Sequence, residues 1–227
     1  MIEINEVEKT YTAGETKVHA LRGISLSINK SEFTSIAGPS GSGKTTLLNL
    51  IGCIDSVDHG TISIEGKQVS SLDKKEAALY RRHTLGFVFQ SYNLIPVLTA
   101  FENVAFALSL LKLKDREVND RVNAILKEVG LEGMENRRPA KLSGGQQQRV
   151  AIARALVKEP DIVLADEPTA NLDSKTGESI LALMKTLNER KGTTFLFSTH
   201  DRMVMDFADR LVQLHDGLVT EDKRRSA

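Results

Sequence analysis

A glycine-rich loop at residues 38–45 constrains the fold of this chain more than any other feature. Its sequence GPSGSGKT fits the phosphate-loop pattern G-x-x-x-x-G-K-T. The apolar residues 33–37 before it predict a short strand, and residues 44–54 predict a helix that begins inside the loop. Because the motif requires a strand before it and a helix after it, this context favours an α/β fold with a nucleotide site.

The loop predicts contacts with the phosphates of a nucleotide. Its glycines let successive backbone N–H groups converge on phosphate oxygens, and the start of the following helix favours negative charge. Lys44 is expected to reach the β and γ phosphates, and the Thr45 hydroxyl to bind Mg²⁺. The nucleotide contacts predicted in this segment are Gly38, Pro39, Ser40, Gly41, Ser42, Gly43, Lys44, Thr45 and Thr46.

A second strand, predicted at residues 162–166, ends on an acidic pair. Residues 162–165 are continuously apolar, as buried parallel strands tend to be, and Asp166 and Glu167 follow them. Open α/β sheets bind ligands at the C-terminal ends of their strands. Asp166 is therefore expected to hold Mg²⁺ through its water shell, and Glu167 to polarise the attacking water. Taken alone, adjacent acids at a strand end are often merely solvated; after a phosphate loop, that alternative loses most of its weight.

The remaining patterns complete a mixed fold. Alternating apolar residues predict half-buried antiparallel strands at 2–7, 24–28 and 61–64. Further strands are predicted at 85–89, 195–197 and 211–214, and helices at 99–129, 146–158 and 174–190. We predict a single α/β domain over residues 1–227, with a mostly parallel sheet, an antiparallel β layer and an inserted α-helical subdomain at about 99–142. The charged residues 223–227 are expected to fray.

Composition excludes several classes of protein. Thirty basic and thirty acidic residues cancel, and no long basic run is present, which argues against a nucleic-acid partner. The one cysteine, Cys53, excludes a disulfide framework; it is expected to be a small buried residue, with a redox role as the alternative. Residues 104–113 form the longest apolar-rich stretch, far short of the ~20 residues of a membrane span. With acids where a signal peptide needs basic residues, the chain is expected to be cytoplasmic and to reach a membrane only through a partner.

Residues 142–146, with the sequence LSGGQ, form the second distinctive motif. Taken alone, this segment is a glycine turn whose serine caps the helix that follows. Exposed backbone N–H groups at a helix start also form an anion site. After a phosphate loop, and followed by QQRVAIARAL at residues 147–156, the segment resembles the ATP-binding-cassette (ABC) ATPase family over roughly residues 1–220.

The resemblance implies a P-loop NTPase core of the ABC ATPase type, with ATP and Mg²⁺ as its ligands. In that family the LSGGQ segment of one copy contacts the ATP held by a second copy, so the expected partner is a second copy of this chain. The ATP contacts implied across this dimer are Ser143, Gly144, Gly145, Gln146 and Asp173. Hydrolysis by in-line attack of water then reopens the dimer.

Three further positions match the family one by one. Gln90, after the strand predicted at 85–89, matches the glutamine that senses Mg²⁺ and the attacking water. His200, after the strand at 195–197, matches the switch histidine that contacts the γ-phosphate. Tyr11 matches the aromatic residue that stacks on adenine. Alone, these would be a surface glutamine, a structural histidine and an ordinary strand-end tyrosine.

Within the family, the chain is most similar to the lipoprotein-releasing and macrolide-export ATPases. Residues 51–55, 85–96 and 146–149 carry this finer match, while Ser31 and Ala170 stand where glycine, and glycine or serine, are usual. The likeness implies membrane-spanning subunits on separate chains, with this subunit at the cytoplasmic face of the membrane. We place their dock on residues 91–106, because this loop is unusually apolar for one that no partner covers; burial in the helical subdomain is the alternative.

Two rival functions remain open at this point. Soluble ABC proteins of DNA repair, chromosome handling or translation carry coiled-coil inserts, zinc-binding cysteines or two cassettes, none of which is present here. A regulatory ABC ATPase of cell division, which acts on cell-wall hydrolases through a membrane partner without transport, is separated poorly from the export group by sequence. The transported molecule itself leaves no trace in this chain.

Overall fold

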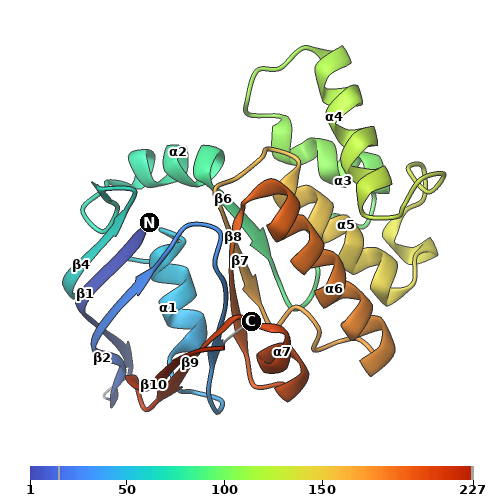
Figure 1. The fold of residues 1–227 in the computed structure, drawn as a ribbon. Coiled ribbons are helices and arrows are strands. Elements are labelled where there is room, and N and C mark those ends of the chain that lie inside the picture. The colour runs from blue at the N-terminus through green and yellow to red at the C-terminus, as the bar shows by residue number, and fades with distance from the viewer. Residues whose placement is uncertain (15, 226–227) are drawn as a thin grey trace. The chain divides into compact units, whose positions relative to one another are not determined.

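The computed structural model describes residues 1–14 and 16–225 (Figure 1). The contacts within the chain group it into two compact units. Unit 1 combines residues 1–81 with the residues from 194 onward, and unit 2 comprises residues 82–193. The single domain predicted over residues 1–227 stays a prediction, and each unit is described by itself.

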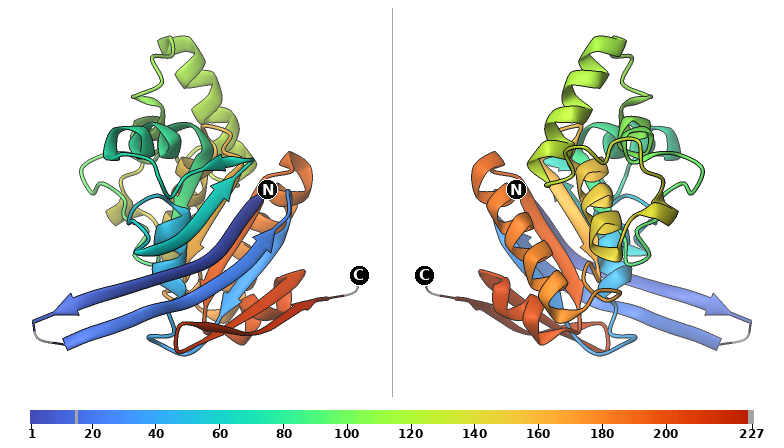
Figure 2. Two further views of the ribbon diagram at one scale, coloured as in Figure 1. Left: turned by 90° about the vertical axis from the view of Figure 1, so that its left-hand side faces the viewer. Right: turned by 90° about the vertical axis from the view of Figure 1, so that its right-hand side faces the viewer.

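Unit 1 contains an antiparallel sheet with the strand order β2-β1-β4-β5. Its strands are β1 (Ile2–Ala13), β2 (Thr16–Ile28), β4 (His59–Ile64) and β5 (Lys67–Gln68). Ile24, Leu26 and Ile28 are buried and alternate with more exposed serines, which confirms the half-buried strands that the sequence predicted. The first two strands form a long hairpin, blue in Figure 2. Its far end was not predicted, because residues there face solvent and carry no apolar alternation.

The second sheet of unit 1 supports the phosphate loop. β3 (Phe33–Ala37) is fully buried and lies parallel to both β8 (Thr194–Thr199) and β9 (Arg210–His215), and β10 (Leu218–Arg224) pairs antiparallel with β9. The helix α1 (Lys44–Ile51) contacts β8 and β2, so it lies between the two sheets of this unit. Phe33 and Phe197 pack with ring centroids 4.5 Å apart. The short helix α7 (Arg202–Phe207) follows β8.

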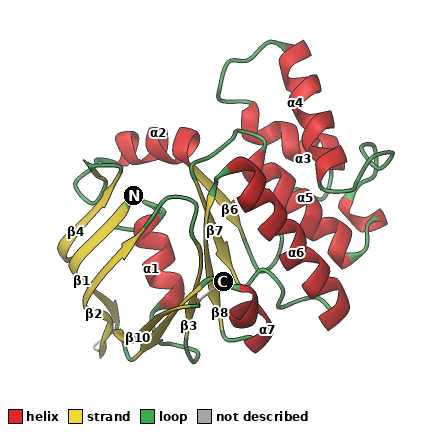
Figure 3. Ribbon diagram, viewed as in Figure 1, coloured by secondary structure: helices red, strands yellow, loops and turns green. Residues whose placement is uncertain are grey.

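Unit 2 contains a parallel strand pair and most of the helices (Figure 3). β6 (Leu85–Val88) lies parallel to β7 (Ile162–Asp166), and α5 (Gly144–Leu156) packs on β6. α3 (Ala100–Ala105) contacts both α4 (Asp115–Glu128) and α5. Two 3₁₀ helices, η1 (Phe106–Leu108) and η2 (Pro139–Lys141), and the long α6 (Ser174–Lys191) complete the unit. The predicted fold class, an α/β fold with an antiparallel layer and a helical block, is confirmed.

Several predicted boundaries are wrong. The helix predicted at 44–54 ends at Ile51, because Gly52 caps it and Cys53 adopts a positive φ of 53°. The helix predicted at 99–129 is broken between η1 and α4. The prediction that residues 223–227 fray is wrong for Lys223, Arg224 and Arg225, which continue strand pairing or bond to Asp209; residues 226–227 lie outside the described residues.

Four elements have no counterpart in the sequence prediction: α2 (Lys74–Thr84), β5, α7 and β10. These four elements bury few side chains in the core. In α2 only Ala77 is buried, and no residue of β10 is buried. An element that buries so little leaves no periodic apolar pattern in the sequence.

Candidate functional site

The phosphate loop has the backbone geometry that its glycines predict. It leaves the end of β3, and Gly38 donates its N–H to the Thr199 carbonyl at 3.3 Å. A Cβ atom on Gly38 would lie 2.1 Å from the Leu214 carbonyl oxygen, so no larger residue fits there. Gly43, which caps α1, has a φ of 101°, a conformation that glycine adopts without cost.

The interior of the loop suits an anionic ligand. The Lys44 ammonium is nearly buried and donates to the carbonyl oxygens of Gly38 and Pro39 at 2.8 and 2.9 Å, which holds it over the loop. Ser42 is buried, and its hydroxyl is one of the few buried side-chain polar atoms of the described residues with no hydrogen-bond partner. A buried cation and an unused hydroxyl beside a helix start fit the phosphates of a nucleotide. Thr45, which the sequence predicted as a Mg²⁺ ligand, lies in the first turn of α1.

The structure brings His200 to this loop. β3 and β8 are parallel neighbours with Ala37 opposite Thr199, so the loop and His200 leave the same edge of the sheet. Together they line a cavity of about 280 Å³, whose walls are Ala37, Gly38, Pro39, His200, Met205 and Gln213. His200 is exposed and lies beside the phosphate loop.

Tyr11 lies against the first turn of α1. Its hydroxyl hydrogen-bonds with the Thr46 side chain and donates to Asp55 at 2.7 Å. Burial and the bond to Asp55 raise the pKa of the phenol above its ordinary value, so Tyr11 is protonated at neutral pH. The side chain is still 39% exposed, which leaves ring surface for a ligand beside the phosphate loop.

In unit 2, the predicted acidic pair Asp166–Glu167 and Gln90 lie at the same edge of the strand pair. Val88 lies opposite Ala165 in the parallel register, so Gln90 and the Asp166–Glu167 pair both follow strand ends. The loop after β7 is tied to the loop after β6, because Asn171 donates to the Gln90 carbonyl at 2.8 Å. Glu167 has a φ of 47°, a left-handed conformation uncommon for a side-chain-bearing residue.

The LSGGQ segment forms a capping box at the start of α5. The Ser143 hydroxyl accepts the Gln146 N–H at 3.3 Å, and the Gln146 side chain accepts the Ser143 N–H at 2.9 Å. A Cβ on Gly145 would lie 2.5 Å from the Thr176 side chain, and Thr176 donates to Asp173 at 2.6 Å. Thr176 thus brings Asp173, the N-cap of α6, close to the LSGGQ segment; the contacts of both with a second copy stay a prediction.

Sequence reasoning missed the residues that support these side chains. Gln148 is fully buried and donates to the Pro168 carbonyl at 2.6 Å, beside Glu167. Asn171 holds Gln90 as described above, while Asp55 and Lys9 surround Tyr11. Each bond joins residues far apart in the chain, so no local spacing predicts it. Asp55 and Gln148 lie in residues 51–55 and 146–149, which carry the family likeness, but nothing in the sequence shows which residues they contact.

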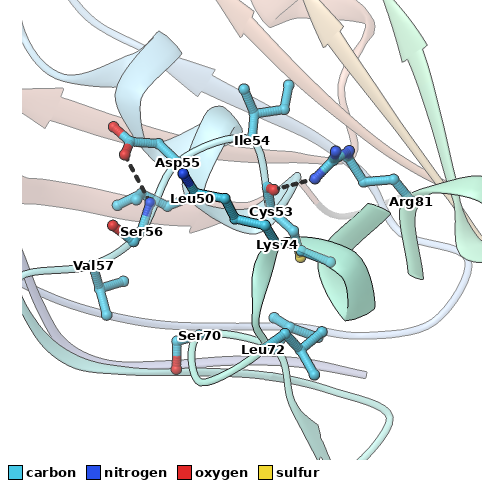
Figure 4. A pocket seen from close by; sticks show the side chains of 12 residues that line it. Leu50, Cys53, Ile54, Asp55, Ser56, Val57, Ser70, Leu72, Lys74 and Arg81 are labelled. Atoms are coloured by element: carbon cyan, nitrogen blue, oxygen red, sulfur yellow. Dashed lines mark hydrogen bonds between the residues drawn. The ribbon is translucent and has the colours of Figure 1, made fainter. Parts of the chain in front are cut away.

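Cys53 is buried, as predicted, and faces a different part of unit 1 (Figure 4). It lines a cavity of about 370 Å³ together with residues of α1, α2 and the turn after β5. Burial raises the pKa of the thiol to about 11, and the nearby Arg81 lowers it only in part. The cavity contains none of the predicted nucleotide contacts. Its lining is Leu50, Cys53, Ile54, Asp55, Ser56, Val57, Val69, Ser70, Leu72, Lys74, Ala77 and Arg81.

Across the residues that the structure describes, we find no helix with the length and apolar character needed to cross a membrane.

Comparison with known proteins identifies the family. Residues 21–170 match the ABC transporter family model. The chain is 48% identical over 228 residues to the uncharacterized ABC transporter ATP-binding protein MJ0796 of Methanocaldococcus jannaschii, which covers 99% of this chain and 97% of that protein. A solved dimeric structure of that cassette, in a post-hydrolysis state with ADP and Pi, has a TM-score of 0.91 at 46% identity and covers all of both chains.

Two further relatives have descriptive names. The lipoprotein-releasing system ATP-binding protein LolD of Alcanivorax borkumensis is 44% identical over 219 residues, 96% of each chain. The macrolide export ATP-binding/permease protein MacB of Syntrophobacter fumaroxidans is 44% identical over 221 residues, 96% of this chain but 31% of the relative. The chain belongs to the ABC transporter family. Within it, this protein is an ATP-hydrolysing, nucleotide-binding subunit of the transporter type, as the motifs predicted.

Proposed function

We propose that two copies of this chain bind two ATP–Mg²⁺ between them and drive separate membrane subunits from the cytoplasmic face of the membrane. The observation that carries this is the division of ATP-binding features within one chain. Unit 1 holds a phosphate loop with Lys44 and His200, and unit 2 holds the acidic strand end with a capped LSGGQ segment. The related MJ0796 cassette, solved as a dimer with ADP and Pi, supports a second copy as the partner.

ATP is held mainly by unit 1 in this proposal. Residues 38–46 receive the phosphates through backbone N–H groups and the Lys44 ammonium, and Tyr11 stacks on the base. From the second copy, LSGGQ residues 143–146 and Asp173 approach the γ-phosphate. The Ser143 hydroxyl accepts the Gln146 N–H, which leaves its own proton to donate to a phosphate oxygen.

Hydrolysis depends on unit 2 residues and on His200. Bound Mg²⁺ would neutralise charge on the phosphates, held by the Thr45 hydroxyl, Gln90 and Asp166. Glu167 accepts a hydrogen bond from the attacking water and orients it. Gln90 and His200 contact the water and the γ-phosphate. Gln148 fixes the Pro168 carbonyl next to Glu167, which keeps this carboxylate at the strand end.

Replacing Glu167 by Gln tests the catalytic assignment. The amide keeps the shape of the carboxylate but is a poor base, so turnover should fall by about 10²–10⁴-fold while ATP still binds. The variant should also accumulate as an ATP-bound dimer, which size-exclusion chromatography detects. Glu132→Gln is a matched control, because Glu132 forms only a surface ion pair with Lys127. Full turnover in Glu167→Gln, or a monomer at saturating ATP, would contradict the proposal.

The membrane subunit docks on residues 91–106 in our proposal. No apolar side chain from Leu94 to Leu98 is fully buried, Val97 is 70% exposed and Phe106 is 59% exposed. The loop is nonetheless ordered, because Arg154 donates to the carbonyls of Tyr92 and Asn93. An ordered loop with exposed apolar side chains next to Gln90 suits a partner that responds to ATP hydrolysis.

We infer the class of transported molecule from the names of the related proteins. We propose lipoprotein release or macrolide or peptide export, through a partner with few membrane spans and a large extracytoplasmic domain. Leu94→Glu and Leu98→Glu should abolish co-purification with the membrane subunit while ATP affinity stays unchanged. Val18→Glu, which adds a charge at an exposed position of the hairpin, is the control. If the two leucine variants unfold instead, the loop is part of the core and the dock lies elsewhere.

A further inference from the structure

We propose that Asp55 is a positioning residue for nucleotide binding: it anchors the Tyr11 hydroxyl so that the ring is held ready for the base before ATP arrives. The inference rests on the proposed stacking role of Tyr11. Asp55 does not touch the nucleotide in this proposal, and acts through the tyrosine alone.

Asp55 is itself held firmly behind the phosphate loop. The chain reverses after α1 through the left-handed Cys53, and the N–H groups of Ile54 and Asp55 return to the Asn49 carbonyl at 2.9 and 3.4 Å. The side chain accepts the Ser56 N–H at 2.7 Å (Figure 4). Its carboxylate is therefore fixed relative to α1, the helix that begins in the phosphate loop.

Tyr11 is tied to this helix at two points. Its hydroxyl lies 2.7 Å from Asp55 Oδ2 and also hydrogen-bonds with the Thr46 side chain in the first turn of α1. Tyr11 belongs to β1, a strand of the antiparallel sheet of unit 1. The outer part of this sheet is the two-stranded hairpin of β1 and β2. Without these bonds the ring has no anchor to the helix that carries the phosphate loop.

Lys9 completes the arrangement. Lys9 is only 7% exposed, and its ammonium contacts Asp55 Oδ1 at 3.0 Å, the Ser56 carbonyl at 2.7 Å and Asp58 at 3.6 Å. It lies 5.3 Å from the centroid of the Tyr11 ring. Lys9 therefore covers one face of the ring and compensates the charge of Asp55, and the other face is left for a base.

The protonation states keep this arrangement intact at neutral pH. Burial opposes the charge of Asp55, but its bonds from Tyr11, Lys9 and Ser56 outweigh burial and lower its pKa. Burial also opposes the charge of Lys9, and Asp55 and Asp58 outweigh it and raise the pKa of the ammonium. The carboxylate, the ammonium and the neutral phenol therefore coexist over the physiological range.

An anchored ring binds more tightly because it loses less freedom on binding. Tyr11→Phe keeps the stacking ring and removes the anchor, and Asp55→Ala removes the acceptor. Each should weaken ATP binding about 3- to 10-fold, the range expected for immobilising one side chain. The two losses should not add in the double variant, because both break the same bond.

Calorimetric titration with two ligands tests the proposal. ATP–Mg²⁺ has a base, whereas inorganic tripolyphosphate–Mg²⁺ addresses only the phosphate loop. Asp55→Ala and Tyr11→Phe should weaken ATP binding and leave tripolyphosphate binding within about 2-fold. Glu132→Gln is the control; it neutralises a surface carboxylate of unit 2 that pairs with Lys127, and should leave both ligands unaffected.

Three outcomes would overturn the proposal. Equal loss of both ligands would mean that Asp55 shapes the phosphate loop, and additive losses would mean that Asp55 acts apart from Tyr11. Wild-type ATP affinity in Tyr11→Phe would mean that the anchor does not matter, a result that does not depend on whether Asp55→Ala folds. If Tyr11→Ala also binds ATP as the wild type does, the proposed stacking role of Tyr11 is wrong. Failure of the stacking role and failure of the anchor can be told apart, because Tyr11→Phe removes the anchor and keeps the stacking ring.

Discussion

The backbone conformation of Cys53 places its thiol in a buried environment. Its φ of 53° turns the chain directly after α1, and the side chain enters the buried wall of unit 1. Burial raises the pKa of its thiol to about 11. The thiolate is the reactive form of cysteine, so the structure favours an inert residue over the redox alternative that the sequence left open.

We predict that Cys53 reacts slowly with iodoacetamide in the folded protein. At about pH 8, the thiolate fraction falls about 200-fold between a thiol of ordinary pKa and one with a pKa of about 11. The greater nucleophilicity of a more basic thiolate recovers about 10-fold of this. Alkylation should therefore be at least about 20-fold slower in the native protein than in urea, as mass spectrometry measures. Equal rates in both states would show that the thiol is accessible and ionised.

At the scale of elements, Asn103 of α3 holds residues 95–99 of the proposed docking segment in place. It is fully buried on α3; its amide donates to the carbonyls of Ile95, Leu98 and Thr99, and its carbonyl accepts the Ile95 N–H at 2.7 Å. Thr99 then caps α3 in a capping box with Glu102. The Asn103 side chain thus supplements the backbone bonds of this segment, in which the Leu98 N–H donates to the Ile95 carbonyl at 3.1 Å.

Asn103→Leu should loosen this loop and destabilise the protein. The substitution replaces the amide by an apolar side chain and leaves the Ile95 N–H and the Leu98 carbonyl without the partner that Asn103 supplies, at a cost of about 2 kcal/mol in the free energy of unfolding. Urea unfolding measures the loss, and amide exchange at Ile95 should accelerate. Asn119→Leu, on the exposed surface of α4, is the control and should change stability by less than about 0.5 kcal/mol. A loss of equal size in the control would contradict the clamp.

Elements were predictable from the sequence where they are buried on more than one side. β3 and β7 were predicted with their observed bounds, since both are continuous apolar runs. α2 and β10 were missed because they face the core with one residue or none. The same division holds for the site. The glycine-rich loops can be recognised in the sequence because their backbone conformations require glycine. Gln148 and Asp55 act through contacts that only the folded chain creates.

At the scale of the whole molecule, unit 1 is built from the two ends of the chain. Residues 1–81 supply β3, and the residues from 194 onward supply β8 and β9 on either side of it. Arg210 of β9 ties these parts together. It bonds to Glu32 before β3 at 2.9 Å, to the Ser27 carbonyl of β2 at 2.7 Å, and to Asp222 of β10 through two bonds. Hydrogen bonds to Asp222 and Glu32 outweigh burial and raise the pKa of the guanidinium.

The C-terminal strand should therefore contribute to stability in a pH-dependent way. The bidentate bond from Arg210 lowers the pKa of Asp222 below its ordinary value. The stabilisation is present above pH ~4, where the unfolded carboxyl is ionised, and is lost as the pH falls through the lowered folded pKa. A charged pair of this kind is worth about 1.5–3 kcal/mol. Asp222 is 37% exposed and partly screened, so Asp222→Asn should lose about 1 kcal/mol at pH ~7.

Urea unfolding of the wild type and of Asp222→Asn at pH values from about 7 down to about 3 measures this contribution. The two unfolding free energies should differ most near neutral pH and converge at the acidic end, because protonated aspartic acid and asparagine carry the same charge. Glu221→Gln is the matched control: it lies on the same strand, pairs only with the exposed Lys223, and should change stability by less than about 0.5 kcal/mol. A difference between the two unfolding free energies that stays constant with pH would mean that Asp222 stabilises the strand through packing and not through its charge interaction with Arg210.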